Sequence, residues 1–131
     1  MQTYLEQTVE AAETAREMRK LGDYKLARDR AYYAIFYAVA GLLDLSGEGR
    51  VREDAPFADS AALREFSSRF VQTGEASTDL GRAIAVAKNL RDKADYSEGV
   101  ATPEEADEAL AAMEQMLAFA EPVLRKGETE S

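Results

Sequence analysis

The sequence contains neither cysteine nor histidine. Without cysteine the chain cannot form disulfides or use a thiol nucleophile, and without both residues it cannot build a Cys/His zinc site. Acidic residues are frequent, but none of their clusters has the loop spacing of a dedicated Mg²⁺ or Ca²⁺ site. We therefore expect the protein to work without a metal or another cofactor.

Long apolar runs and a surplus of basic charge are also missing. The longest apolar run spans residues 31–43, fewer than the ~20 residues that cross a bilayer. The N-terminus does not have the pattern of a signal peptide, so we expect a cytoplasmic protein without membrane contact. The net charge of −9 argues against broad affinity for nucleic acid, which depends on counterion release from phosphates. We expect no DNA binding, and any RNA contact must be local.

Helical periodicity is what the sequence does contain. Apolar residues recur at spacings of three and four, and no segment alternates convincingly with period two. A chain of 131 residues points to a single domain with one core. We therefore predict an all-α domain over residues 1–126, followed by a flexible tail over residues 127–131.

The first predicted helix runs from about Thr3 to Leu21, and Gly22 stops it. The second begins after a cap at Asp23 and runs to about Leu43. Because the second helix is apolar on most sides, it should be the central and most buried helix.

Glycine, proline and mixed charges indicate a loop over residues 46–59, which we expect to be the most disordered part of the chain. Asp59 or Ser60 should cap a third helix, and Ser77 or Thr78 should cap a fourth.

The last helix has the clearest start. Thr102 is its cap, Pro103 is its first residue, and Glu105 completes a capping box. Pro122 should bend or fray its last turn.

The fourth helix carries a group of basic residues with few acids among them: Arg82, Lys88, Arg91 and Lys93. Such a group can face phosphate, because arginine holds phosphate oxygens bidentately, or it can balance acids on a neighbouring helix. Both interpretations stay open. On the second helix, aromatic residues at helical spacing most often build a core, but the hydroxyls of Tyr33 and Tyr37 need polar partners if buried. Those partners could lie near Arg91.

The segment NLRDKADY places Arg91 four residues before Asp95 and five before Tyr96. On a straight helix Asp95 lies about 40° from Arg91, whereas Tyr96 lies about 140° away. The simplest interpretation is an Arg91–Asp95 pair on a solvated helix face. Arg91 can meet Tyr96 only if the helix frays or bulges there.

Three segments, in the order RAYYAIFYAVAGLL, FADSAALREFSSRFVQTGE and NLRDKADYSEG, resemble successive parts of the HEPN domain in its small stand-alone prokaryotic branch. The resemblance spans roughly residues 22–117. It implies an up-and-down antiparallel bundle of four to five helices that forms a homodimer around a polar motif. Members are often encoded beside a minimal nucleotidyltransferase as a toxin–antitoxin pair, and many are metal-independent ribonucleases.

The motif of this family is an arginine followed, after four to six residues, by a histidine. Arg91 matches the arginine, but Tyr96 stands where the histidine would be. RNA cleavage needs an acid and a base tuned near neutrality. Tyrosine, with a pKa of ~10, is ionised in only about one molecule in a thousand at neutral pH. Tyr96 would therefore be a poor base unless Arg91 lowered its pKa strongly.

Our first hypothesis is a module that binds a nucleotide or RNA phosphate without efficient cleavage and acts with a nucleotidyltransferase partner. Arg91 would clamp the phosphate, Asp95 would orient it, and Lys88 and Lys93 would attract it. Tyr33 and Tyr37 would line the pocket.

The resemblance leaves Tyr96 two further roles. It could accept a nucleotidyl group from the partner enzyme. In our second hypothesis, an endoribonuclease toxin, Arg91 and Tyr96 would be the catalytic residues. The third hypothesis is a purely structural helical module, in which Arg91 and Asp95 form only a surface pair.

Overall fold

A computed structural model describes residues 2–48, 58–96 and 100–130; at residues 48, 94–96 and 130 it describes the backbone alone. The helices are α1 (Tyr4–Lys20), α2 (Tyr24–Leu43), α3 (Ala58–Phe66), α4 (Thr78–Tyr96) and α5 (Pro103–Glu130). Two short π-helical segments, η1 (Asp44–Glu48) and η2 (Ser67–Val71), follow α2 and α3 directly. The described ranges contain no strand, so the predicted all-α fold is confirmed.

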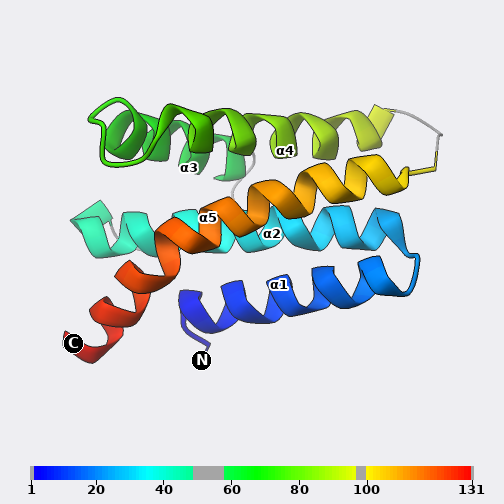
Figure 1. Ribbon diagram of the computed structural model, residues 1–131. Coiled ribbons are helices and arrows are strands. Elements are labelled where there is room, and N and C mark those ends of the chain that lie inside the picture. Colours follow the sequence, from blue (N-terminus) through cyan, green and yellow to red (C-terminus); the bar gives the residue numbers. More distant parts are fainter. Residues whose placement is uncertain (1, 49–57, 97–99, 131) are drawn as a thin grey trace.

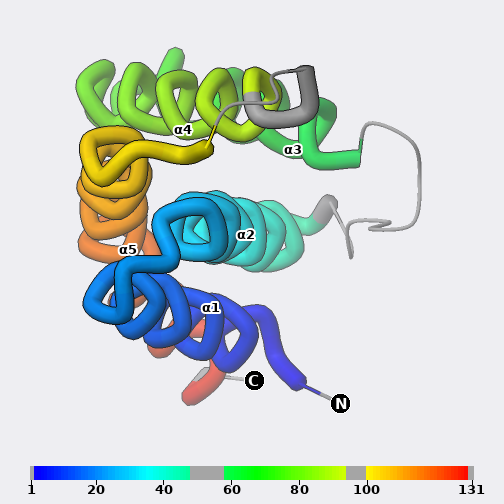
Figure 2. The backbone as a smooth tube through the Cα atoms, turned by 90° about the vertical axis from the view of Figure 1, so that its right-hand side faces the viewer, coloured from blue at the N-terminus to red at the C-terminus, as the bar shows by residue number. Residues whose placement is uncertain are grey.

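Helix α2 lies at the centre of the bundle. Seen from its end, α3 and α4 lie side by side on one side of α2, α1 lies on the opposite side, and α5 runs along the flank (Figure 2). Thirteen of the 20 residues of α2 are buried, which confirms the prediction that it is the most buried helix. None of the described helices combines the length and the apolar composition that a bilayer crossing requires.

Local signals in the sequence set the hairpin of α1 and α2. Thr3 caps α1, and its hydroxyl accepts a hydrogen bond from the Glu6 backbone at 3.0 Å. The chain leaves α1 at Gly22, whose φ of 83° is costly for any other residue. Asp23 then caps α2 by accepting a hydrogen bond from the Leu26 backbone at 3.0 Å.

The third helix begins differently from the expectation. Within the described residues α3 starts at Ala58, so Asp59 lies in its first turn rather than at a cap position. Most of the predicted loop over residues 46–59 lies outside the described residues, and the part that is described belongs to η1 and α3. The carboxylate of Asp59 accepts a hydrogen bond from the hydroxyl of Tyr32 of α2.

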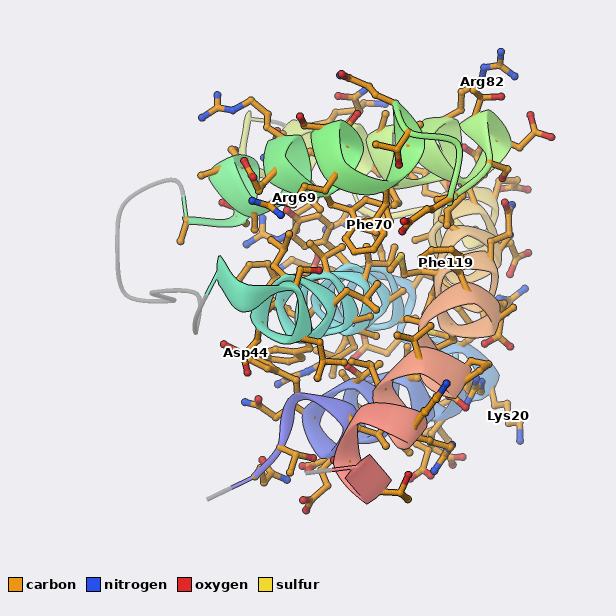
Figure 3. All side chains as sticks on the ribbon, turned by 90° about the vertical axis from the view of Figure 1, so that its left-hand side faces the viewer. Lys20, Asp44, Arg69, Phe70, Arg82 and Phe119 are labelled. Carbon is orange, nitrogen blue, oxygen red and sulfur yellow. The ribbon has the colours of Figure 1, made fainter. Side chains whose placement is uncertain are left out.

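Aromatic side chains fix η2 to the rest of the bundle. The rings of Phe66 and Phe70 stack at 5.1 Å between centroids. Phe119 of α5 meets both rings edge-on at about 6 Å. Figure 3 shows Phe70 and Phe119 on the inner side of their helices, whereas Arg82 points outward.

The two remaining helices start as the sequence predicts. Ser77, not Thr78, caps α4 by accepting from the Leu80 backbone at 3.0 Å. Thr102 and Glu105 form the predicted capping box of α5. Helix α5 bends in its C-terminal part (Figure 1), where Pro122 removes a backbone donor.

Helix α5 is longer than expected. It continues to Glu130, so residues 127–130, which we expected in a flexible tail, are helical. Leu45 of η1 packs directly on Gly127, where an added Cβ would lie only 2.8 Å from the methyl groups of Leu45. This contact gives the C-terminal turns of α5 a partner that the local sequence does not reveal.

Candidate functional site

Four polar side chains meet where α2, α3 and α4 come together: Tyr32, Asp59, Lys88 and Asp92, which we call the polar cluster. The hydroxyl of Tyr32 donates to Oδ2 of Asp59 at 2.6 Å. The ammonium of Lys88 lies 3.5 Å from the same Oδ2 and 2.7 Å from each carboxylate oxygen of Asp92. The polar cluster therefore ties the first turn of α3 to both α2 and α4.

Each helix supplies its part for a simple reason. Lys88 and Asp92 are four residues apart on α4, a spacing that brings two side chains together on one helix face. Tyr32 lies on the packed surface of α2 and is only 3% exposed, so its hydroxyl must find a polar partner inside the protein. The first turn of α3 provides that partner.

Burial, hydrogen bonds and neighbouring charges shift the pKa values of three groups of the polar cluster: Tyr32, Asp59 and Lys88. Burial and the hydrogen bond to Asp59 raise the pKa of Tyr32 well above its usual value, while the charge of Arg91 acts in the opposite direction. Burial alone would raise the pKa of Asp59, but Tyr32 and Lys88 outweigh it, so that pKa is lowered.

The pKa of Lys88 is set by the same two effects, burial and neighbouring charges, but each acts in the opposite direction because Lys88 is a cation. Burial alone would lower its pKa, but Asp92 and Asp59 outweigh it and the pKa is raised. At neutral pH Lys88 is therefore charged, Asp59 is ionised and Tyr32 is a neutral donor. None of the three is suited to exchange protons with a substrate near pH 7.

Two arginines border the polar cluster. Arg91 is half-buried on α4 next to Asp92, close enough to Tyr32 to act on its pKa. Arg28 lies one turn before Tyr32 on α2 and is only 4% exposed; its guanidinium contacts Asp29 at 3.1 Å. Its charge also helps to lower the pKa of Glu105, after the larger effect of the Thr102 backbone. The sequence pattern does not mark Arg28, Tyr32, Asp59 or Asp92 as site residues.

The basic group predicted on α4 is real but divided. Arg82 is exposed and pairs with Asp79 at 3.0 Å. Lys88 is balanced by two carboxylates, and Lys93 is exposed. Arg82 and Lys88 thus balance acids, Lys88 in part on the neighbouring α3, while the phosphate-facing interpretation stays a prediction for Arg91 and Lys93.

The two predicted pocket tyrosines lie at different distances from the polar cluster. The ring of Tyr33, 37% exposed, meets the ring of Tyr32 at 6.1 Å between centroids. Tyr37 lies one turn farther along and lines a polar hollow of about 190 Å³ between α1 and α2, together with Glu10 and Arg30. Tyr33 thus adjoins the polar cluster, whereas Tyr37 faces a separate hollow.

The other two predicted site residues are described only by their backbone. Helix α4 continues without a break through residues 91–96. The side chains of Asp95 and Tyr96 lie outside the described part of the chain. Because α4 shows no fray or bulge there, the condition for a meeting of Arg91 with Tyr96 is not met. The pairing of Arg91 with Asp95 stays a prediction.

Charge is distributed unevenly over the helices. Helix α5 carries eight acidic and two basic residues, whereas α4 carries three acidic and four basic residues. Among the described residues, no group of three carboxylates is placed to hold a metal ion. The electrostatic environment of α4 is therefore more favourable for an anionic ligand than that of α5.

Comparison with known proteins identifies the family. The family model of the HEPN domain matches residues 1–123. A protein named "Putative toxin MJ0605", from Methanocaldococcus jannaschii, is 35% identical over 100 residues, which cover 74% of this chain and 70% of the relative. No solved structure gives a significant match. The chain belongs to the HEPN domain family.

Proposed function

We propose that the chain is a HEPN module of toxin–antitoxin type that binds a phosphate of RNA or of a nucleotide at Arg91 and does not cleave RNA efficiently. The observation that carries the proposal is the position of Arg91. It is half-buried on α4, beside the polar cluster and on the helix with the basic excess. The name of the Methanocaldococcus relative, which is that of a toxin, supports the toxin–antitoxin part.

A guanidinium in this position suits a phosphate. Arginine offers two parallel N–H donors to two phosphate oxygens, and partial burial strengthens such charge-assisted hydrogen bonds. The polar cluster next to it is held by its own hydrogen bonds, so it forms a firm support beside Arg91. Lys93 would add attraction, and Asp95 would orient the guanidinium until phosphate competes for it.

The chemistry around Arg91 favours binding over cleavage. Transfer of the 2′-hydroxyl proton and protonation of the leaving oxygen need groups with pKa values near neutrality. The chain has no histidine, and the described titrating groups beside Arg91 have pKa values displaced from that range. In the alternative, a ribonuclease, Tyr96 would be the proton donor, but an unperturbed tyrosine is almost wholly protonated at pH 7 and could not also serve as the base.

RNA binding with and without Arg91 tests the proposal. Fluorescence anisotropy with a labelled single-stranded RNA should show at least about tenfold weaker binding for Arg91→Ala, because a hydrogen bond between charged groups is worth roughly 1.5–3 kcal/mol. Arg82→Ala is the matched control, since Arg82 lies on the same helix, is exposed and pairs with Asp79. Equal losses of RNA affinity in both variants would mean that only the overall charge matters, and would refute a specific site at Arg91.

The partner and the oligomeric state are part of the same proposal, supported by membership of the family. A minimal nucleotidyltransferase would transfer a nucleotidyl group from a nucleoside triphosphate to the hydroxyl oxygen of Tyr96, which loses its proton as pyrophosphate leaves. The module would form a homodimer. Co-expression followed by peptide mass mapping should find the added mass on Tyr96 and none in Tyr96→Phe. An unmodified Tyr96 would count against the transfer, and a light-scattering mass equal to the 14.4 kDa of one chain would count against the dimer.

A further inference from the structure

A groove runs between α3–η2 and α4, next to the polar cluster, with which it shares Lys88. Helix α3 packs mainly on α2, and α4 packs mainly on α5 and α2, so the two contact each other little although they lie side by side (Figure 2). The space between them has a volume of about 330 Å³. Val71 lies over Gly81, where an added Cβ would be 3.2 Å from Cγ1 of Val71.

The lining of this groove divides into an apolar floor and a polar rim. The floor consists of Leu63, Phe66, Val71, Gly81, Ile84 and Ala85. The rim consists of Ser60, Arg64, Ser67 and Lys88. A cleft of this size, mostly apolar and with a few polar groups at its mouth, has the form of a small-molecule site.

The rim is positive although the protein is acidic. None of the ten lining residues is an acid, in a chain with a net charge of −9. The charge of Lys88 is balanced by Asp59 and Asp92. Arg64 is exposed, and the structure gives it no ion pair or hydrogen bond to another described residue. Its guanidinium is therefore the one cation of the rim whose charge the described residues leave unbalanced.

We propose that the groove binds a small amphipathic carboxylate with an aromatic or short acyl body. The apolar body lies along Leu63 and Ile84, where it gains by leaving water. The carboxylate pairs with Arg64 at the mouth, and the hydroxyls of Ser60 and Ser67 lie on the same side as further donors. Arg91 does not line the groove, although the groove shares Lys88 with the polar cluster beside Arg91, and binding in the groove does not require phosphate at Arg91.

An NMR titration of the nitrogen-15-labelled full chain with 1-naphthoate tests the site. Shift changes should concentrate on residues 60–71 and 81–88. The uncharged analogue 1-naphthamide should bind about tenfold more weakly, since it cannot make a charge-assisted pair with Arg64. Shift changes spread over the other helices, no shift changes at millimolar 1-naphthoate, or equal affinity for the two compounds would overturn the proposal.

Variants separate the two halves of the site. Arg64→Gln should weaken the binding of 1-naphthoate about tenfold and leave that of 1-naphthamide unchanged. Arg82→Gln removes an exposed cation of α4 that does not line the groove and should change neither. Ala85 is exposed and lines the groove, so Ala85→Phe can fill it without disturbing the core and should abolish binding. Ala61→Phe, also exposed but outside the groove, is the control. Binding that survives Ala85→Phe with a native-like spectrum would refute the site.

Discussion

The hydroxyl of Tyr32 holds the first turn of α3 against the centre of the bundle. It is buried and donates to Asp59 over 2.6 Å, across 27 residues of sequence. Because Asp59 also faces Lys88, the removal of the hydroxyl would leave the carboxylate with a weaker set of partners. The same contact lowers the pKa of Asp59, so it makes stability depend on pH.

Tyr32→Phe should lower the free energy of unfolding by about 1–2 kcal/mol at pH 7. The folded state lowers the pKa of Asp59, so the stabilisation is complete above the unfolded value near 3.8 and is lost as the pH falls through the folded value. The difference in the free energy of unfolding between the natural sequence and Tyr32→Phe should therefore shrink below about pH 4. Urea unfolding at pH 7, 5, 4 and 3 measures it.

Tyr33→Phe is the matched control for Tyr32→Phe. Tyr33 is the next residue, is 37% exposed, and makes no hydrogen bond that the described structure records. Loss of the Tyr33 hydroxyl should change the free energy of unfolding by less than about 0.5 kcal/mol at every pH. If both variants lost the same stability, or if the gap for Tyr32→Phe did not change with pH, the account of the polar cluster would be wrong.

Single residues of the site were predictable only where the information is local. The spacing of Lys88 and Arg91 on one helix can be read from the sequence. The pairing of Tyr32 with Asp59 cannot, because it depends on how α3 packs on α2 after a long connection. The burial of Arg28 could not be predicted, because an arginine in a helix is usually exposed and the neighbouring helices cause its burial here.

The approach of α5 to α2 depends on a missing side chain at Gly41. An added Cβ would lie 2.8 Å from Leu124 and 3.0 Å from the Cβ of Tyr4, and both neighbours are buried. Gly41→Ala should therefore destabilise the protein by about 1–3 kcal/mol, although alanine favours the helix. Urea unfolding measures the change.

Gly127→Ala provides the contrast. Here the close atoms are the methyl groups of Leu45, a half-exposed side chain that can move aside. The greater helix propensity of alanine should then prevail, and we expect a change between zero and about 1 kcal/mol of added stability. Equal destabilisation by Gly41→Ala and Gly127→Ala would show that the packing of Gly41 is not special.

The start of α4 yields a test of capping. Ser77→Ala should cost about 1 kcal/mol, because its hydroxyl accepts a hydrogen bond from the Leu80 backbone. Thr78→Ala, one residue later, should cost much less. Thermal unfolding measures the loss of stability of both variants. A larger loss for Thr78→Ala than for Ser77→Ala would contradict the assignment of Ser77 as the cap of α4.

Most helix starts could be predicted because caps are local. Thr102, Glu105 and Asp23 all make the backbone contacts that their spacing indicates. The end of α5 could not be predicted, because the contact of Leu45 with Gly127 joins segments far apart in the sequence. The π-helical continuation of α3 as η2 likewise depends on the packing of its aromatic rings on Phe119.

The distribution of charge over the molecule limits how RNA would bind at the proposed site. The acids gather on α5, while the basic residues near Arg91 are few. We therefore expect a weak salt dependence: the slope of log affinity against log salt should lie between about −1 and −2, which corresponds to roughly two phosphate contacts on a single strand. Anisotropy between 50 and 200 mM salt measures it, and a much steeper slope would indicate a broad basic surface.

The central claim is that Arg91 holds an RNA phosphate and that the RNA stays intact. The most direct measurement incubates purified protein and end-labelled single-stranded RNA with excess metal chelator, and reads each sample on a native and a denaturing gel. The account predicts shifted, uncleaved RNA for the natural sequence and for Arg82→Ala, and loss of the shift for Arg91→Ala. Cleavage by the natural sequence that disappears in Arg91→Ala would contradict the account and make the protein a histidine-free HEPN ribonuclease.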